Sequence, residues 1–312
     1  QADTIEFALN SEENFLINLP TSCGKTLIAE IIIIEIILKT KKKALYLAPY
    51  KALAHEKAVG LKQRWNNLGL HIVQLTGRQS VSEDTLHSAD IIILTNEKAD
   101  IIFRNKKREK LFQSIGLIVC DEIHMLGEGN RDMSLEVLLT RFLFAKRKLL
   151  LNCRIIGLSA TVGNPLDLAH WFEAKLITSE WRPVVLQEFV YCGGKMFGKQ
   201  YEPKKYSVHK ELISNRNEDL VRLVENILRS NSQALVFLNT IAETEMMKNY
   251  LIKQGKIKQG IEFHHAWLED KEKSERELKF KKAEIKILLS TTTLAAGINL
   301  PATYVIIYSI LH

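Results

Sequence analysis

Short apolar runs alternate with longer, mixed stretches along the first 180 residues of the chain. The runs predict buried strands and the stretches between them predict helices, an alternation typical of an α/β fold with a parallel sheet. The clearest predicted helices run from Lys51 to Leu68 and from Asp132 to Leu150. The predicted strands cover residues 15–19, 44–48, 72–75, 91–94, 115–120 and 155–159.

The pattern changes after residue 180. Trp181-Arg182-Pro183 opens a stretch rich in Gly, Lys and Pro, which predicts a strand returning over the first domain and then a mobile connector. From about Glu218 the alternation resumes, with helices at 218–230, 242–254 and 269–283 and strands at 234–238, 261–264, 285–290 and 304–308. We therefore expect a first domain at 1–180, a return strand and connector at 181–206, and a second domain at 207–312.

A phosphate-binding loop is predicted where the first strand meets a helix. The strand leads into Pro20-Thr21-Ser22-Cys23-Gly24-Lys25-Thr26 and then into a helical stretch. In such a loop Gly24 lets the backbone approach phosphates, Lys25 reaches the β- and γ-phosphates, and the Thr26 hydroxyl binds Mg²⁺. Leu19 stands where the strict pattern has Gly, so the loop alone leaves open an ordinary turn that contains Gly-Lys-Thr.

An acidic pair follows the most continuous apolar strand, Ile115 to Cys120. Asp121 and Glu122 lie at its carboxyl end, where ligands bind in open α/β sheets. Asp121 is placed to hold Mg²⁺ through water, and Glu122 is placed to orient or deprotonate the attacking water. A lone Asp-Glu pair is usually a solvated loop, but the upstream phosphate loop favours a catalytic pair. We expect His124 to link the nucleotide to the second domain and not to bind metal.

Taken in order, these motifs resemble the DExH-box superfamily 2 helicases of the Ski-like branch. Within that branch the chain looks closest to the HELQ-type repair helicases and the helicase domain of polymerase theta. The family's first motif itself lacks the strict leading Gly, which accounts for Leu19. The similar segments are Pro20–Thr26, Ala48–Ala54, Thr95–Lys98, Asp121–Gly127, Ser159–Thr161, Ala234–Thr240, His264–Ala266 and Thr291–Ala302. Trp267 departs from the family, which usually has Gly there.

The resemblance implies two RecA-like parallel-sheet domains of the P-loop NTPase class, with ATP and Mg²⁺ bound between them. The sequence stops before the family's motif VI, so the second domain is expected to be truncated at its C-terminal end. Lys25, Asp121 and Glu122 would be catalytic, Thr26 and Asp121 would hold the metal, and His124, Ser159 and Thr161 would couple hydrolysis to movement. The residues implied to bind the nucleotide are Gln1, Thr21, Ser22, Cys23, Gly24, Lys25, Thr26 and Gly297.

The implied activity is an ATP-dependent helicase that moves 3′→5′ on single-stranded DNA in DNA repair. Such motors contact the polymer backbone through hydroxyls, amides and N–H groups at strand ends, with little sequence preference. The matching positions are Pro49, Lys51, Thr76, Gly77, Thr95, Asn239, Thr240, Thr292 and Thr293. The alternatives are an RNA helicase of the same branch, which would rest on a 2′-hydroxyl contact, and a nucleotide-binding clamp with little turnover.

Composition adds modest limits. The net charge of +7 is compatible with a polyanionic partner. The family resemblance implies that this partner is single-stranded or forked nucleic acid, with DNA favoured over RNA, and it leaves protein partners unknown. None of the four cysteines forms a Cys-x-x-Cys pair, which favours a reducing interior. The family resemblance implies an intracellular location, nuclear in a eukaryote and cytoplasmic in a prokaryote. The most apolar stretch, Ile31 to Leu38, is far shorter than the roughly 20 residues of a membrane span.

Overall fold

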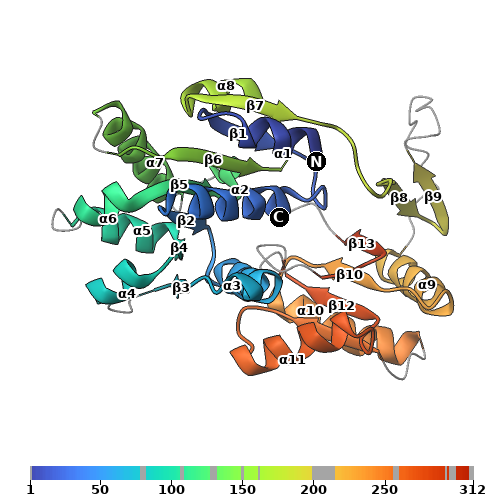
Figure 1. Cartoon of the computed structure of the whole chain (residues 1–312). Coiled ribbons are helices and arrows are strands. Elements are labelled where there is room, and N and C mark those ends of the chain that lie inside the picture. Colours follow the sequence, from blue (N-terminus) through green and yellow to red (C-terminus); the bar gives the residue numbers. More distant parts are fainter. Residues whose placement is uncertain are drawn as a thin grey trace. The chain divides into compact units, whose positions relative to one another are not determined.

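The computed structural model forms two compact units, Gln1–Val185 and Leu186–His312 (Figure 1). The structure describes residues 2–77, 82–105, 109–126, 132–148, 151–160, 162–198, 215–255, 260–291, 294 and 300–308. Among these residues, no helix is long and apolar enough to cross a membrane.

The elements of the first unit alternate between strands and helices, as the apolar runs predict. They are α1 (Ala2–Leu9), β1 (Asn14–Asn18), α2 (Lys25–Thr40), β2 (Lys43–Ala48), α3 (Lys51–Trp65), η1 (Asn66–Leu68), β3 (Ile72–Leu75), α4 (Glu83–Ser88), β4 (Ile91–Thr95), α5 (Asn96–Phe103), α6 (Glu109–Ser114), β5 (Ile115–Cys120), η3 (Ile123–Met125), α7 (Asp132–Arg147), β6 (Arg154–Ser159), α8 (Pro165–Trp171) and β7 (Ala174–Thr178).

The strands of this unit form one sheet in the order β3-β4-β2-β5-β6-β1-β7, and all neighbouring strands in it are parallel. All carboxyl ends therefore meet at one edge of the sheet. Asn18 at the end of β1 is in register with Ser159 at the end of β6. Cys120 at the end of β5 is in register with Leu47 of β2. The phosphate loop, the acidic pair and Ser159 consequently share one edge.

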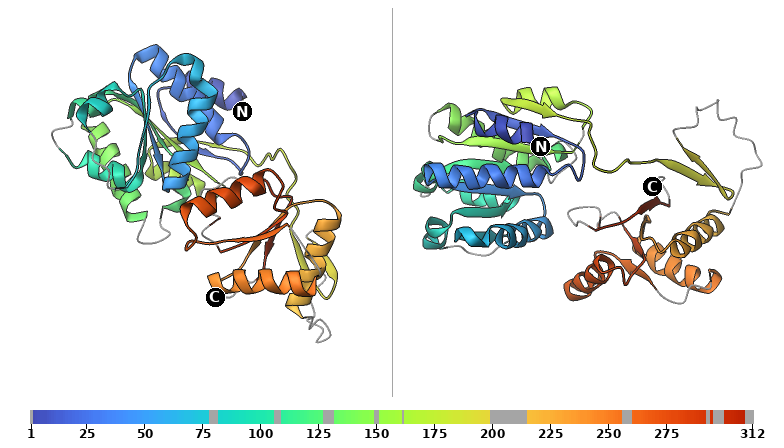
Figure 2. Two further views of the ribbon diagram at one scale, coloured as in Figure 1. Left: turned by 90° about the horizontal axis from the view of Figure 1, so that it is seen from below. Right: turned by 45° about the vertical axis from the view of Figure 1, so that its right-hand side comes forward.

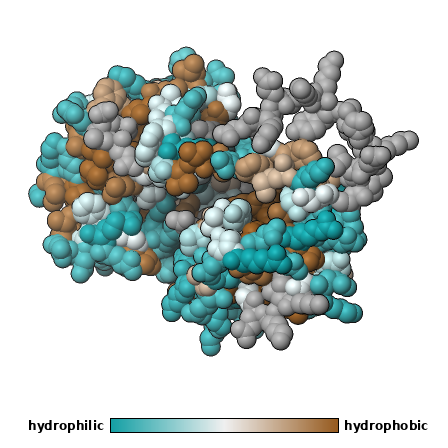
Figure 3. All heavy atoms as spheres, turned by 90° about the vertical axis from the view of Figure 1, so that its right-hand side faces the viewer, coloured by the Kyte–Doolittle hydropathy of each residue, from teal (hydrophilic) through white to brown (hydrophobic). Residues whose placement is uncertain are grey.

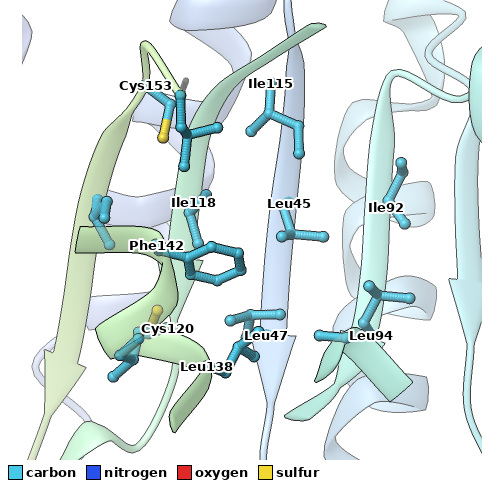
Figure 4. Close-up of a cluster of buried hydrophobic side chains, with 14 of the residues drawn as sticks. Leu45, Leu47, Ile92, Leu94, Ile115, Ile118, Cys120, Leu138, Phe142 and Cys153 are labelled. Atoms are coloured by element: carbon cyan, nitrogen blue, oxygen red, sulfur yellow. The ribbon is translucent and has the colours of Figure 1, made fainter. Parts of the chain in front are cut away.

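Helices cover both faces of this sheet (Figure 2). On one face, α2 and α3 pack on alternate strand residues such as Phe15, Tyr46 and Val119. On the other face, side chains of α5 and α7 pack on the intervening residues, among them Leu45, Ile92 and Ile118 (Figure 4). A strand buried on both faces must be apolar throughout, which is why β5 reads as a continuous apolar run.

Helix α2 forms although it carries four consecutive β-branched isoleucines. Ile28, Ile32, Ile33 and Ile37 are buried against the sheet, while Leu38 at the outer side is exposed. The packed face outweighs the weak local helix propensity of isoleucine. The helix starts where the phosphate loop ends, so this packing fixes the direction of the loop.

The second unit contains a smaller parallel sheet in the order β11-β12-β10-β13. Helices α9 and α10 pack with β10 on one face, and Phe280 of α11 packs against Leu288 on the other. Its elements are β8 (Phe189–Cys192), β9 (Lys195–Gly198), α9 (Arg216–Arg229), β10 (Ala234–Phe237), α10 (Ile241–Gln254), β11 (Ile261–His264), α11 (Asp270–Lys281), β12 (Ile287–Ser290) and β13 (Tyr304–Ile307).

The segment after residue 180 differs from its prediction. In place of one strand returning over the first domain, β8 and β9 pair with each other as an antiparallel hairpin that groups with the second unit. Gly193 and Gly194, both with positive φ, make the tight turn, and their N–H groups donate to the Asp219 carboxylate. A Gly-Gly pair between two β-prone runs is a hairpin signal that favours this structure.

Apolar residues such as Val184 and Val190 stay exposed here, and hydrophobic surface is visible elsewhere on the molecule (Figure 3).

Candidate active site

The phosphate loop is shaped by two residues with left-handed backbone. Ser22 has a φ of 64° and Gly24 a φ of 81°, and Gly24 is the N-cap of α2. The Gly24 carbonyl accepts the first helical bond from Ile28 N–H at 3.1 Å. This turns the chain sharply into the helix and leaves the N–H groups of its first turn directed at the loop, a ready anion site. Thr21 and Ser22 are exposed at the mouth of the loop.

Lys25 lies at the first position of α2 and folds back over the loop. Its Nζ donates to the carbonyls of Leu19 at 2.8 Å and Pro20 at 3.1 Å. Burial lowers the pKa of Lys25, while Glu122 and Asp121 oppose that effect. The ammonium therefore shares an electrostatic environment with the acidic pair, although the two motifs are 96 residues apart, 121 minus 25.

Cys23 anchors the loop through its buried side chain. Its side chain is 3% exposed, and its thiol donates to the Trp181 carbonyl at 2.9 Å. A small, soft side chain suits this buried position. The thiol thus ties the loop to the segment that leaves the first sheet.

Asp121 is held in place by three hydrogen bonds. Its N–H donates to Leu47 O at 2.9 Å, Tyr46 donates its hydroxyl to Oδ2 at 2.6 Å, and Glu122 N–H donates to Oδ1 at 3.1 Å. The residue is 5% exposed. A buried carboxylate needs such partners, and they fix the direction of its remaining lone pairs.

Glu122 has an unusual backbone for a residue with a side chain, with a φ of 51° and a ψ of 43°. Left-handed conformations of this kind gather at functional sites, where they aim a side chain away from the regular path. Burial and the neighbouring Asp121 raise the pKa of Glu122, while His124, Lys25 and Lys57 act in the opposite direction. A carboxyl group whose pKa is raised in this way is suited to accept a proton from water.

His124 joins the acidic pair to the Ser-Ala-Thr segment. Its Nδ1 accepts the Ala160 N–H at 3.2 Å and lies 3.3 Å from Glu122 Oε2. A ring nitrogen that accepts an N–H has no proton to donate to a carboxylate, so these two contacts are alternatives. Ser159 is fully buried, and its carbonyl accepts the Leu19 N–H at 3.2 Å. The loop, Ser159-Ala160, His124 and Glu122 therefore form a connected series within the first unit.

Two residues of the site were missed by sequence reasoning. Tyr46 lies inside an apolar strand and reads as core, and Lys57 lies on α3 in a stretch that matches no motif. Lys57 Nζ donates to Thr26 Oγ1 at 2.9 Å and lies 3.7 Å from Asp121 Oδ2. The signal for Tyr46 was its phenol at a buried position, since such a hydroxyl needs a partner. Lys57 carried no comparable signal.

Several residues predicted to contact nucleic acid meet in a pocket of about 310 Å³ on the first unit. These residues lie at the carboxyl ends of β2, β3 and β4, and Glu97 and Lys98 of α5 also line the pocket. Lys51 approaches Gly77 so closely that a Cβ on Gly77 would lie 3.3 Å from Lys51 Nζ. Thr76 is half-buried next to this position. The pocket is lined by Pro49, Tyr50, Lys51, Gly77, Thr95, Glu97, Lys98 and Ile101.

On the second unit, Asn239 and Thr240 form the start of α10. Thr240 Oγ1 accepts the Glu243 N–H at 3.2 Å. The Glu243 carboxylate in turn accepts from Asn239 N–H at 3.0 Å and from Thr240 N–H at 3.2 Å. A polymer phosphate at these N–H groups would have to replace that carboxylate. The remaining predicted positions, Gln1, Thr161, Thr292, Thr293 and Gly297, lie outside the described residues.

Comparison with known proteins agrees with this arrangement. Residues 1–169 match the DEAD/DEAH box helicase family, and residues 215–311 match the helicase conserved C-terminal domain. The chain belongs to the DEAD/DEAH box helicases. The two parallel sheets are therefore RecA-like domains, and the resemblance to HELQ-like superfamily 2 helicases is confirmed.

Several curated proteins that are similar to this chain are named ATP-dependent DNA helicase Hel308. The protein from Pyrococcus horikoshii is 36% identical over 98% of this chain, and that from Caldivirga maquilingensis is 33% identical over 98%. A third, from Methanococcus vannielii, is 32% identical over 98% of the chain. The chain spans 43–44% of the length of these relatives. Trp267, where the helicase family usually has Gly, is 84% exposed, so its bulk displaces no core residue.

Proposed function

We propose that this chain is the motor portion of an ATP-dependent DNA helicase. The observation that carries the proposal is the contact of one ammonium group, on Lys57, with both Thr26 and Asp121. It brings the hydroxyl of the phosphate loop within a few ångströms of the carboxylate of the acidic pair. A phosphate cradle next to an acidic pair is the arrangement that nucleoside triphosphate hydrolysis requires.

The oxygen donors present fit Mg²⁺. Thr26 supplies a hydroxyl and Asp121 a carboxylate, which are hard ligands of the kind Mg²⁺ prefers, and both already face a cation. No cluster of three or more His, Cys, Asp or Glu side chains that could hold a metal occurs in the part of the chain that the structure describes. Mg²⁺ in such sites keeps several waters and is completed by substrate phosphates, so two protein ligands suffice. When bound, it would offset charge on the β- and γ-phosphate oxygens.

The chain's own residues divide the remaining work. Lys25 would leave the Leu19 and Pro20 carbonyls for the phosphate oxygens, which are stronger acceptors. Glu122 would take the proton of the attacking water. His124 would respond to protonation of Glu122, because its Nδ1 cannot accept a hydrogen bond from the Ala160 N–H and from a protonated Glu122 at the same time. Loss of the Ala160 bond would be passed through Ser159 to Leu19 at the start of the phosphate loop. Coupling through Thr161 remains a prediction.

DNA is the proposed polymer because the similar proteins are named DNA helicases. The pocket formed by Pro49, Lys51, Gly77 and Thr95 supports a path for the strand across the first unit. Lys51 offers charge, and the strand ends offer N–H and hydroxyl groups to backbone phosphates. Movement 3′→5′, preference for forked substrates, a role in DNA repair and an intracellular location are further parts of the proposal, and these rest on the family resemblance.

The test is ATP hydrolysis by the wild-type chain and by Glu122→Gln, each with no polymer, with single-stranded DNA or with single-stranded RNA. Glu136→Gln, at an exposed position on α7, is the matched control and should behave as wild type. Stimulation by DNA that is lost in Glu122→Gln supports the proposal. Stimulation by RNA alone would move the assignment to RNA, and tight nucleotide binding without turnover would leave a nucleic-acid clamp.

A further inference from the structure

A second lysine is built into the candidate active site. Lys57 comes from the middle of α3, and its side chain is only 11% exposed. Its Nζ donates to Thr26 Oγ1 at 2.9 Å and lies 3.7 Å from Asp121 Oδ2. These are the two residues proposed to hold Mg²⁺, and in the described part of the chain no other side chain forms a hydrogen bond or ion pair with both of them.

The position of Lys57 follows from charge balance in a buried site. Asp121 is 5% exposed, and the neutral Tyr46 hydroxyl on Oδ2 cannot offset its charge. A buried carboxylate beside a second carboxylate is costly unless cations lie nearby. Lys25 is directed at the Leu19 and Pro20 carbonyls, so Lys57 is the ammonium closest to Asp121 among the described ion pairs.

An ammonium group and a metal ion compete for the same oxygen lone pairs. A lysine ammonium has only donors, so it occupies the lone pairs of Thr26 and Asp121 without coordinating a metal. A divalent cation needs those same lone pairs, and it is repelled by a fixed positive charge a few ångströms away. The two cations cannot both hold this position.

We infer that Lys57 is a built-in counter-ion of the acidic pair that competes with the divalent cation for Thr26 and Asp121. It keeps the site neutral and folded when metal is scarce, and it must turn away for metal and nucleotide to bind together. The inference rests on the proposed function for the identity of the site. It makes metal binding by this chain weaker than its oxygen ligands alone would give, and so favours metal that arrives with phosphates.

The test is Mn²⁺ binding to the full 312-residue chain without nucleotide. Binding is measured as the decrease of the free Mn²⁺ signal in electron paramagnetic resonance. Lys57→Met should bind Mn²⁺ on the order of tenfold more tightly than wild type, because the competing charge is gone. Lys62→Met, at an exposed position on the same helix, is the matched control and should equal wild type. Lys57→Arg keeps the charge and should also stay near wild type.

Thermal unfolding gives a second readout that does not depend on turnover. Lys57→Met should unfold at a lower temperature than wild type without divalent cation, and MgCl₂ should raise its Tm more than that of wild type. If Lys57→Met fails to fold, Lys57→Gln keeps a donor for Thr26 without the charge and should show the same two effects. Mn²⁺ affinity in the neutral variants equal to or below that of wild type would overturn the inference.

A double variant separates this inference from the proposed function. Asp121→Asn added to Lys57→Met should abolish the gained Mn²⁺ affinity if the metal binds where proposed. If the gained affinity survives Asp121→Asn, the metal lies elsewhere, and both the inference and the proposed metal site fail. If Asp121→Asn weakens Mn²⁺ binding in wild type while Lys57→Met has no effect, the metal site stands and only the role of Lys57 is overturned.

Discussion

The hydroxyl of Tyr46 donates a hydrogen bond to Oδ2 of Asp121 at 2.6 Å, from β2 to the end of the neighbouring β5. Tyr46 is fully buried, and burial together with Asp121 raises its pKa well above the ordinary value. The phenol therefore keeps its proton and always acts as the donor. A side chain that looks like ordinary core in the sequence thus fixes the orientation of a proposed metal ligand.

Replacing Tyr46 with Phe should lower the free energy of unfolding by about 2 kcal/mol, since a hydrogen bond to a charged, buried acceptor is lost at nearly constant volume. Urea unfolding of the chain measures this change. Tyr304→Phe, at a position 43% exposed, is the control and should stay within about 0.5 kcal/mol of wild type. Equal stability of Tyr46→Phe and wild type would mean that water replaces the phenol at no cost.

Glu30 of α2 holds this helix against α3 through Arg64 and Trp65. It is fully buried, and its carboxylate accepts from Arg64 Nε at 2.8 Å and from Trp65 Nε1 at 3.1 Å. Glu30→Gln should destabilise the chain by about 2 kcal/mol, because Arg64 loses its charged partner at a buried acceptor. The matched control is Glu35→Gln on the same helix, whose partner Lys39 is 68% exposed, and it should cost about 0.5 kcal/mol or less. Equal losses of stability in the two variants would show that the interaction of Glu30 with Arg64 contributes no more than a surface ion pair does.

Much of this architecture could be predicted because the local signals agree with the fold. Strands such as β5 are buried on both faces, so their sequence is continuously apolar. The phosphate loop carries its own signature in Gly24-Lys25-Thr26. Helix α2 could be predicted only from its place after that loop, since its isoleucines favour strands.

The features that could not be predicted from the sequence can also be explained residue by residue. Strand β7 lies at the sheet edge and is only partly buried, so Ala174–Thr178 shows no clear apolar run. The hairpin of β8 and β9 is exposed, and its Gly193-Gly194 turn lies in a stretch whose Gly, Lys and Pro content is also typical of a connector. Lys57 acquires its role from tertiary contacts with Thr26 and Asp121, which lie 31 and 64 residues away in the sequence, 57 minus 26 and 121 minus 57. No periodicity or spacing on α3 reports such contacts.

Glu122 should make stability depend on pH. Burial and Asp121 raise its pKa in the folded chain, so the folded state binds this proton more tightly than the unfolded state does. Its favourable contribution is therefore complete below the unfolded pKa of about 4.3 and is lost as pH rises through the folded value. Glu122→Gln cannot titrate, so its stability relative to wild type should increase as pH rises through that window.

Thermal unfolding of wild type and Glu122→Gln over a series of pH values measures this difference. Glu136→Gln, at an exposed position on α7, serves as the control for the loss of one glutamate charge. A stability difference between Glu122→Gln and wild type that stays constant with pH would show that Glu122 titrates in the folded chain as it does in the unfolded chain. In that case it would lack the tuning that a general base at this position needs.

Two glycines of the first unit allow a sharp test of the proposed strand path. Gly77 and Gly69 have nearly the same left-handed backbone, with φ of 65° and 63°. A Cβ on Gly77 would lie 3.3 Å from Lys51 Nζ and 3.4 Å from its Cε, whereas a Cβ on Gly69 would have nothing within 4 Å. Alanine at either position therefore carries the same backbone cost, about 1–2 kcal/mol. The substitution at Gly77 alone must also move Lys51 within the pocket.

Gly77→Ala should weaken binding of a single-stranded DNA oligonucleotide several-fold, because the added methyl group crowds Lys51 and narrows the space beside the strand ends that would hold the backbone. Gly69→Ala should lose the same stability but keep wild-type affinity. Fluorescence anisotropy at one fixed salt concentration measures both affinities, since phosphate contacts depend steeply on salt. If the two variants bind DNA equally well, the pocket around Lys51 lies off the path of the strand, and the DNA must cross the first unit elsewhere.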